Sequence, residues 1–240
     1  MKGWDAEFDC YPSSNARIKF SKTFCEPYLQ TARKVIDIGC GSGKFISQSE
    51  MNGIIGVDLD ITALQIAKRL CTKSEFIVAS VFSLPFRDEV FEFVSLLELI
   101  EHLPAGTELE AIDEVRRILS SNGVLVLSTP NNHYLSNIMD PGFLLGHRHY
   151  SVKSVVEKVQ VLGFSVTECV VRGGFASLFS YDVLMFSKQF LRKRLARVQD
   201  FLEKLSEKEF NCKENGIANI FIALQLDQSA HPNPLDDWAG

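Results

Sequence analysis

Residues 35–43 read VIDIGCGSG, a short apolar run that ends in three glycines spaced two residues apart. The β-branched residues indicate a buried strand, and the glycines indicate a loop without bulky side chains. Such a loop lets a ligand approach main-chain N–H groups and allows the positive φ of a tight turn into a helix. Asp37 stands two residues before the first glycine, where open α/β sheets bind their ligands. The stretch therefore predicts a ligand site at the carboxyl edge of a sheet.

Spacing separates three kinds of glycine-rich loop. The dinucleotide fingerprint needs a third glycine where this chain has Lys44, and the P-loop needs Ser or Thr where it has Phe45. What remains is an acid followed by Gly39, Gly41 and Gly43 at the end of a strand. Glycines also make ordinary turns, so the rest of the chain has to decide.

The composition is that of an ordinary globular protein. The 240 residues suffice for one large α/β domain, with 46% hydrophobic and 23% charged residues. The formal net charge of −5 gives no general electrostatic reason to expect a nucleic-acid partner. No apolar run approaches the length of a membrane span, and residues 1–7 lack the layout of a signal peptide, so we expect a cytoplasmic protein.

The cysteines show no C-x-x-C spacing, so neither a zinc knuckle nor a disulfide framework is expected. Cys40 differs from the others because it stands inside the glycine loop at the start of a helix. Thiols tend to acidify at that place.

Apolar periodicity predicts strands that alternate with helices. We expect helices at residues 14–32, 44–50, 61–70, 108–119 and 151–162, the fourth ended by a turn at 120–123. Strands are expected at residues 35–38, 53–58, 75–80, 91–97, 124–130, 164–171 and 217–226. This alternation is typical of α/β proteins with a mostly parallel sheet.

Several motifs together resemble the class I S-adenosylmethionine-dependent methyltransferases. In order and spacing they are similar to the small-molecule group that includes the ubiquinone O-methyltransferases. The resemblance covers residues 33–172 and rests on residues 37–43, Gly56-Val57-Asp58, Leu84-Pro85-Phe86, 98–103 and 114–131. It implies a Rossmann-like α/β fold, a doubly wound seven-stranded and mostly parallel sheet with an antiparallel last strand. It also implies S-adenosylmethionine as cofactor and a small-molecule acceptor.

This resemblance assigns parts of the cofactor to residues of this chain. Asp37 and the glycine loop are expected to hold the methionine part, and Asp58 to accept hydrogen bonds from the ribose diol, with Asp60 as second candidate. Ser80 stands where relatives carry an acid for the adenine amino group, so main-chain groups near Val81 and Phe82 and the Ser80 hydroxyl are expected to bind adenine. The candidate cofactor-binding residues are Asp37, Gly39, Cys40, Gly41, Gly43, Asp58, Leu59, Ser80, Val81, Phe82 and Leu97.

The segment after the fourth strand carries Glu98, Glu101 and His102. If it is helical, the three side chains share one face. His102 is then the candidate catalytic residue that removes the acceptor's proton, or the acids merely favour a helix start. Some relatives bind magnesium here, with His147 or His149 as a further ligand, but relatives without metal share the segment, and no metal is assigned.

The chain is divided into a helical cap at residues 1–34, a methyltransferase domain at 35–228 and a loose tail at 229–240. The cap either packs on the sheet edge or covers the cofactor. A helical insertion at about 175–210 interrupts the last hairpin, and its helix at 188–205 packs on the domain, covers the acceptor site or forms a homodimer seam. Its basic residues face solvent or an anionic surface.

Two further stretches carry expectations. Arg116 and Arg117 are expected to form a solvated face. Residues 131–148 are expected to be a long irregular wall of the acceptor site, whose apolar side chains favour a partly hydrophobic acceptor. His147, Arg148, His149 and Tyr150 are candidates for contact with an anionic or hydroxylated group.

The sequence therefore predicts methyl transfer to an oxygen or nitrogen of a small acceptor. Two alternatives remain open. One is a non-catalytic nucleoside-binding regulatory or scaffold protein, and the other is a metal-assisted RNA methyltransferase.

Overall fold

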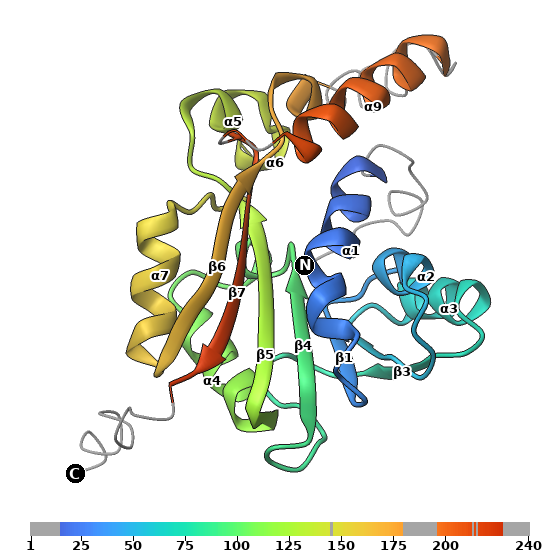
Figure 1. The fold of residues 1–240 in the computed structure, drawn as a ribbon, viewed down its shortest axis with the longest axis vertical. Helices are drawn as coiled ribbons and strands as arrows, with labels where there is room; N and C mark the ends of the chain where they lie inside the picture. Colours follow the sequence, from blue (N-terminus) through green and yellow to red (C-terminus); the bar gives the residue numbers. More distant parts are fainter. Residues whose placement is uncertain (1–14, 145, 180–195, 213, 215, 228–240) are drawn as a thin grey trace.

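The computed structural model describes residues 15–144, 146–179, 196–212, 214 and 216–227. Seven strands form one sheet in the order β3-β2-β1-β4-β5-β7-β6 (Figure 1). The strands from β3 to β5 pair in parallel, whereas β7 runs antiparallel to both of its neighbours. This confirms the predicted mostly parallel sheet with an antiparallel last strand. The strands are β1 (Val35–Ile38), β2 (Ile55–Asp58), β3 (Glu75–Val78), β4 (Phe91–Leu97), β5 (Leu119–Pro130), β6 (Phe164–Arg172) and β7 (Asn219–Leu226).

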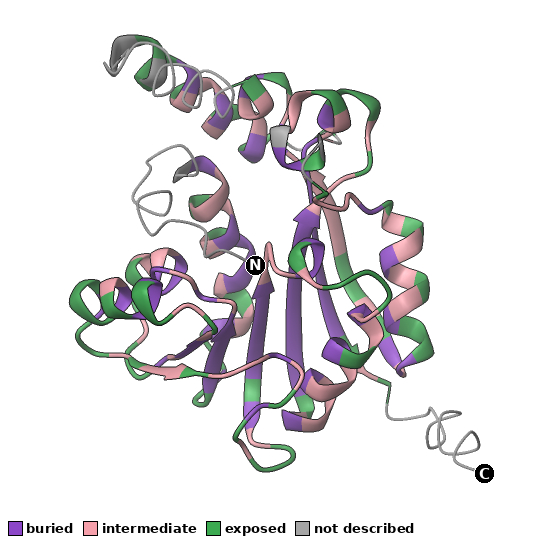
Figure 2. Ribbon diagram, turned by 180° about the vertical axis from the view of Figure 1, so that it is seen from behind, coloured by how far each residue is buried: buried purple, intermediate pink, exposed green. Residues whose placement is uncertain are grey.

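Helices cover both faces of the sheet (Figures 1 and 2). Leu125 of β5 belongs to the core under α4 and α7, whereas its neighbour Val126 belongs to the core under α1, α2 and α3. The middle of the sheet is therefore buried on both sides, as its apolar runs predicted. The helices are α1 (Asn15–Leu29), α2 (Lys44–Gln48), α3 (Ile61–Leu70), the 3-10 helix η2 (Ile100–His102), α4 (Glu108–Ile118), α5 (Tyr134–Met139), α6 (Pro141–Leu144), α7 (Val152–Val161) and α9 (Ala196–Asn211).

Helix α1 packs on the sheet. The rings of Phe20 and Phe24 lie 4.9 and 5.9 Å from that of Phe221 in β7. The first turn of α1 is held by α9, because the Ala16 N–H donates to Glu203 Oε1 at 2.8 Å. Packing of the cap on the sheet is thus observed. A role in covering the cofactor stays a prediction, and residues 1–14 lie outside the described chain.

At the turn predicted for residues 120–123, helix α4 has ended and the chain leaves the pairing with β4. Strand β5 begins at Leu119, which pairs with Phe91, and the pairing resumes at Val124, which pairs with Phe93. Residues 120–123 therefore bulge out of the ladder, with Ser121 and Asn122 exposed.

Residues 131–148 are not irregular throughout, because they include α5 and α6. The imidazole of His133 accepts the Leu135 N–H at the start of α5, and Asp140 Oδ1 accepts the Gly142 N–H at the start of α6. The apolar residues of this stretch have no clear helical period. The capping residues His133 and Asp140 were therefore the features of the sequence that indicated these helices.

The insertion between β6 and β7 is described at residues 175–179, which are helical, and again from α9 onward. The carboxylate of Glu209 in α9 accepts the main-chain N–H groups of Gly174, Ala176 and Ser177 at 2.8–3.0 Å. Leu202 and Phe210 are buried, so α9 packs on the domain. The basic residues 188–194 and the tail at 229–240 lie outside the described residues, and a homodimer through this helix stays a prediction. In the part of the chain that the structure describes, no helix has the length and apolarity to cross a bilayer.

Candidate functional site

The loop after β1 turns on three glycines in the left-handed region. Gly39, Gly41 and Gly43 have φ of 74°, 51° and 74°. The Gly39 and Cys40 N–H groups donate to the Val57 carbonyl at 2.7 and 3.0 Å. These two N–H groups are therefore bonded within the protein. The glycines give the loop its left-handed backbone conformation, and the hydrogen bonds to Val57 of β2 stabilise that conformation.

Asp58, the last residue of β2, links this loop to α3. Its Oδ2 accepts the Gly41 N–H at 2.8 Å, and its Oδ1 accepts the Asp60 N–H at 2.9 Å. A carboxylate has about four lone-pair sites, so each oxygen retains one for a ribose hydroxyl. The carboxylate of Asp60 instead caps α3 by accepting from Thr62 and Ala63, which favours Asp58 over Asp60 as the diol acceptor.

Leu59 lies directly beside this carboxylate, and its side chain is 69% exposed. An exposed leucine next to a diol-binding acid offers an apolar surface to a purine ring. The residues present at this edge therefore fit a nucleoside.

Asp37 is buried in β1 with 2% exposure. Burial raises the pKa of its carboxyl to about 7, the Ser95 hydroxyl that donates to Oδ1 at 2.7 Å opposes this, and the charge of Asp58 adds to it. A cationic group such as the ammonium of S-adenosylmethionine would favour the ionised carboxyl. Asp37 thus fits the methionine end of the cofactor.

Cys40 does not have the acidic thiol that its position suggested. Burial raises its pKa, and the negative charges of Asp37 and Asp58 raise it further. These two carboxyls and the loss of water outweigh the start of the short helix α2. Cys40 is a packing residue at the base of the loop, with 8% exposure.

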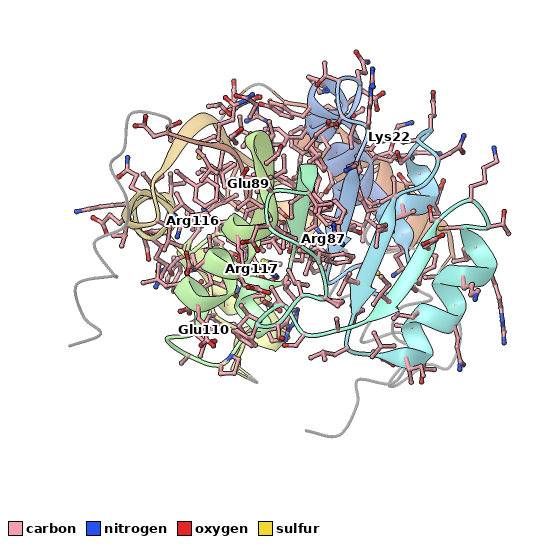
Figure 3. All side chains as sticks on the ribbon, turned by 90° about the horizontal axis from the view of Figure 1, so that it is seen from below. Lys22, Arg87, Glu89, Glu110, Arg116 and Arg117 are labelled. Atoms are coloured by element: carbon pink, nitrogen blue, oxygen red, sulfur yellow. The ribbon has the colours of Figure 1, made fainter. Side chains whose placement is uncertain are left out.

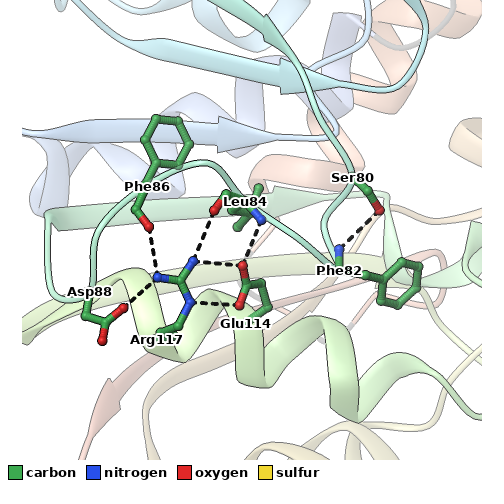
Figure 4. Close-up of polar contacts among 7 residues, drawn as sticks. All are labelled: Ser80, Phe82, Leu84, Phe86, Asp88, Glu114 and Arg117. Atoms are coloured by element: carbon green, nitrogen blue, oxygen red, sulfur yellow. Dashed lines mark hydrogen bonds and ion pairs between the residues drawn. The ribbon is translucent and has the colours of Figure 1, made fainter.

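On the adenine side, the hydroxyl of Ser80 accepts the Phe82 N–H at 3.2 Å (Figure 4). The Phe82 N–H is thus already bonded within the protein. The groups that remain for the expected contacts with adenine are the Ser80 hydroxyl proton and the backbone of Val81. Val81 itself is buried, with 7% exposure.

The segment that follows Ser80 is fixed by α4 (Figure 4). Glu114 Oε1 accepts the Leu84 N–H at 2.7 Å, and Arg117 donates to the Leu84 and Phe86 carbonyls at 3.1 and 2.9 Å. Arg117 also bonds Glu114 and Asp88. The expectation of a solvated face is therefore wrong for Arg117, whereas Arg116 bonds only Asp113 of its own helix. Figure 3 labels both arginines in the view of the molecule from below.

Glu98 follows β4 with a left-handed backbone, φ 56°, and lies outside η2. The interpretation that Glu98, Glu101 and His102 share one helix face is wrong, because only residues 100–102 are helical. Glu98 Oε2 accepts from Arg17 at 2.7 Å and from Asn219 at 2.9 Å, and Oε1 accepts from Ser128 at 2.6 Å. The carboxylate therefore joins α1, β4, β5 and β7 at the carboxyl edge of the sheet.

Glu101 is buried and accepts from the Thr129 hydroxyl at 3.1 Å. Burial raises the pKa of its carboxyl well above the usual range, and the charge of Glu98 adds to this. Glu101 therefore holds its proton more tightly than an ordinary carboxyl.

His102 packs edge-on against His147, with ring centroids 4.4 Å apart. Burial lowers the pKa of His102 to about 4, and the nearby His147 and Arg17 lower it further. The imidazole is therefore neutral at pH 7 and able to accept a proton. Among the described residues, no group of three or more His, Cys, Asp or Glu side chains has the arrangement of a metal site.

Residues 148–150, candidates for contact with an acceptor, bond within the protein through their side chains. Arg148 pairs with Glu108 at 2.7 Å, and the Tyr150 hydroxyl donates to the same carboxylate at 2.8 Å. The two ring nitrogens of His149 lie 2.8 Å from Asn137 Oδ1 and Asp140 Oδ2.

Sequence reasoning missed the partners of Glu98. Ser128 and Asn219 are polar residues at the ends of apolar strands. Because they interrupt the apolar pattern, they could have been recognised as candidate site residues. Arg17 carried no such signal, because a cation on a helix near the chain start is ordinary.

Comparisons with known proteins agree with this geometry. Residues 36–127 match the methyltransferase domain family. The chain is 27% identical over 145 residues to a ubiquinone biosynthesis O-methyltransferase of Pasteurella multocida, covering 53% of this chain and 59% of that protein. It is 32% identical over 103 residues to a probable S-adenosylmethionine-dependent methyltransferase of Mycobacterium tuberculosis, covering 42% and 37%. The chain spans about half the length of the curated relatives it matches first.

The fold has solved counterparts. A Thermotoga maritima S-adenosylmethionine-dependent methyltransferase, described as a possible histamine N-methyltransferase, superposes with a TM-score of 0.61 at 20% identity, covering 88% of this chain and 90% of that one. At this identity the likeness shows the fold alone. The match over residues 36–127 and the named relatives show that this part of the chain is similar to class I S-adenosylmethionine-dependent methyltransferases.

Proposed function

We propose that the protein transfers the methyl group of S-adenosylmethionine to an oxygen or nitrogen of a small, partly hydrophobic acceptor. The observation that carries the proposal is the position of Asp58. Its carboxylate lies against the glycine loop, is held there by the Gly41 and Asp60 N–H groups, and keeps a lone pair on each oxygen for a ribose diol.

S-adenosylmethionine, when bound, supplies a methyl group already activated by a positive sulfonium. The protein's contribution is therefore mainly to bind and align the two reactants. Asp37 and the backbone of the glycine loop hold the methionine end, Asp58 holds the ribose, and Leu59, Ser80, Val81 and Phe82 border the adenine. Leu97 is the last residue of β4, directly before the acidic segment that begins at Glu98.

His102 is the proposed proton acceptor for an oxygen nucleophile. A pKa of about 4 makes it a weak base, but it is neutral throughout the physiological range. An oxygen that has begun to receive a methyl group is a strong acid, so a weak, correctly placed base suffices. For a nitrogen acceptor the same imidazole orients the substrate by a hydrogen bond.

Side chains on α5 support a partly hydrophobic acceptor. Tyr134 and Ile138 are 74% and 58% exposed on the helix that follows the carboxyl end of β5. An exposed aromatic and an exposed aliphatic side chain beside a polar edge favour an acceptor that combines an apolar body with a polar reacting atom.

An acceptor screen tests the proposal. Wild-type protein with radiolabelled S-adenosylmethionine is expected to methylate phenolic or amine acceptors carrying an apolar substituent, and His102→Ala to lose most turnover while binding the cofactor normally. Undiminished turnover of His102→Ala would remove the proposed role of His102. Cofactor binding without methylation of any acceptor class would favour the regulatory or scaffold alternative.

A further inference from the structure

The turn that carries His102 is short and depends on outside contacts. Helix η2 spans only Ile100–His102, and its own closing bond, from the Leu103 N–H to the Ile100 carbonyl, is long at 3.4 Å. The carbonyl groups at the end of a helix need partners from elsewhere. What holds this turn therefore decides where the imidazole lies.

Arg148 supplies those partners. Its Nη2 donates to the Ile100 carbonyl at 2.9 Å and also to the Leu103 carbonyl. The guanidinium thus bridges the first residue of the turn and the residue that follows it. A planar guanidinium offers several donors in a fixed geometry, whereas an ammonium is a point charge on a flexible stem.

The Arg148 guanidinium is itself held by Glu108 of α4 and by Tyr150, two residues further along the chain. Its Nη1 lies 2.7 Å from Glu108 Oε1, and Glu108 is buried with 3% exposure at the first turn of α4. The Tyr150 hydroxyl donates to the same Glu108 oxygen at 2.8 Å, and the Tyr150 ring lies under the guanidinium, 5.9 Å from its Cζ. We call Arg148, Glu108 and Tyr150 the η2 clamp.

The same segment also contacts the imidazole directly. His147, one residue before Arg148, places its ring edge-on against His102. Gly142 leaves room for this, because a Cβ there would lie 2.2 Å from His147 Nδ1. Residues 147 and 148 thus hold η2 from two sides, one through the His102 ring and one through the main chain.

We propose that Arg148 is a positioning residue for His102, and that the η2 clamp sets the place and the water exposure of this imidazole. The inference rests on the proposed function of His102 as proton acceptor. Among the described residues, the Arg148 side chain bonds Ile100, Leu103 and Glu108, none of which belongs to the glycine loop. Its loss is therefore expected to disturb the imidazole and leave cofactor binding intact.

Arg148→Lys is the decisive variant, because it keeps the positive charge opposite Glu108 and removes the bridge to two carbonyls. The readout is the His102 imidazole followed by NMR during a pH titration, which needs neither cofactor nor acceptor. The titratable and charged groups that act on this imidazole are His147, Arg17 and Asp140, all unchanged in the variant. A change in its pKa would therefore report the position and hydration of the ring.

We expect the pKa of His102 to rise in Arg148→Lys from about 4 towards the ordinary value of 6.5, because water reaches the loosened turn. The affinity for S-adenosylhomocysteine is expected to stay within about twofold, since the cofactor residues are untouched. The matched control is Arg116→Lys, an arginine whose side chain bonds Asp113 of its own helix α4 (Figure 3).

If Arg148→Lys does not fold, Tyr150→Phe takes its place in the experiment, because it removes only a hydroxyl. A smaller rise in the pKa of His102 is expected in this variant. An unchanged His102 titration in a folded clamp variant would overturn the proposal. Failure of the wild-type protein to bind the cofactor would contradict the proposed function instead, and would leave this titration interpretable. With an acceptor in hand, the clamp variant is expected to lower kcat about tenfold without raising the KM for S-adenosylmethionine.

Discussion

At the scale of single residues, the site is a set of carboxyl groups whose protonation is set by burial. Asp37 and Glu101 are buried and hold protons more tightly than ordinary carboxyls, whereas Glu98 is surrounded by donors from Arg17, Ser128 and Asn219. The edge therefore combines carboxyls that hold their protons tightly with a histidine that burial keeps neutral. This mixture suits a reaction that begins with a cationic cofactor and ends by releasing a proton.

Asp37 makes the stability of the protein depend on pH. Its pKa of about 7 in the folded state lies above the ordinary 3.8, so its contribution is complete below about pH 4 and is lost as the pH rises through 7. Asparagine cannot ionise. We expect the unfolding free energy of Asp37→Asn, relative to wild type, to rise by roughly 4 kcal/mol between pH 4 and pH 8 in urea titrations. A difference that is independent of pH would contradict this, and Asp200→Asn on the surface of α9 is the control.

At the scale of elements, loops around the site are held by side chains from distant parts of the chain. Arg117 and Glu114 of α4 fix residues 84–88, and Arg148 fixes η2. These loops have few main-chain hydrogen bonds of their own. The side chains bond their main-chain groups instead and so stabilise their conformation. The polar groups at the carboxyl edge thus owe their geometry to contacts far from the cofactor.

Arg117→Lys tests this at α4. The variant loses the fork to Glu114 and leaves the Leu84 and Phe86 carbonyls without their donor, so we expect a loss of about 1–3 kcal/mol in the free energy of unfolding. Chemical denaturation measures it, with Arg116→Lys as the matched control on the same helix. Equal stability of the two variants would show that the bonds of Arg117 add nothing.

The glycine loop and the mostly parallel sheet with an antiparallel last strand could be predicted, because the patterns that indicate them are local. The surroundings of Glu98 could not, since its partners Arg17 and Asn219 lie 81 and 121 residues away along the chain. The bonds of Arg148 to the Ile100 and Leu103 carbonyls, 48 and 45 residues away, were hidden for the same reason. The error at Cys40 has another cause, because burial next to two carboxyls outweighs helix position.

At the scale of the whole molecule, segments far apart in sequence close over one end of the sheet. Helix α9 from the insertion packs on α1, with Phe210 against Phe20 and Glu203 accepting the Ala16 N–H (Figure 1). Glu209 fixes α9 to residues 174–177. The N-terminal helix and the insertion therefore form one unit on the domain.

Glu209→Ala is expected to loosen this unit without unfolding the sheet. The N–H groups of Gly174, Ala176 and Ser177 lose their acceptor, so amide exchange of residues 174–178 and of α9 is expected to accelerate at least tenfold while β4 and β5 stay protected. Asp200→Ala, which removes only a surface pair with Lys204, is the control. Faster exchange across the whole sheet would show that the unit and the domain unfold together.

The most direct test of the account is calorimetric titration of the protein with S-adenosylmethionine and S-adenosylhomocysteine, comparing wild type with Asp58→Asn. Asparagine retains one acceptor oxygen but loses the charge and the second acceptor for a ribose diol. We predict micromolar binding of both ligands by the wild type, weakened about ten- to hundredfold in Asp58→Asn, which is about 1.4–2.7 kcal/mol. No binding of either ligand by folded wild-type protein, or equal binding by the variant, would contradict the assignment of this edge as the cofactor site.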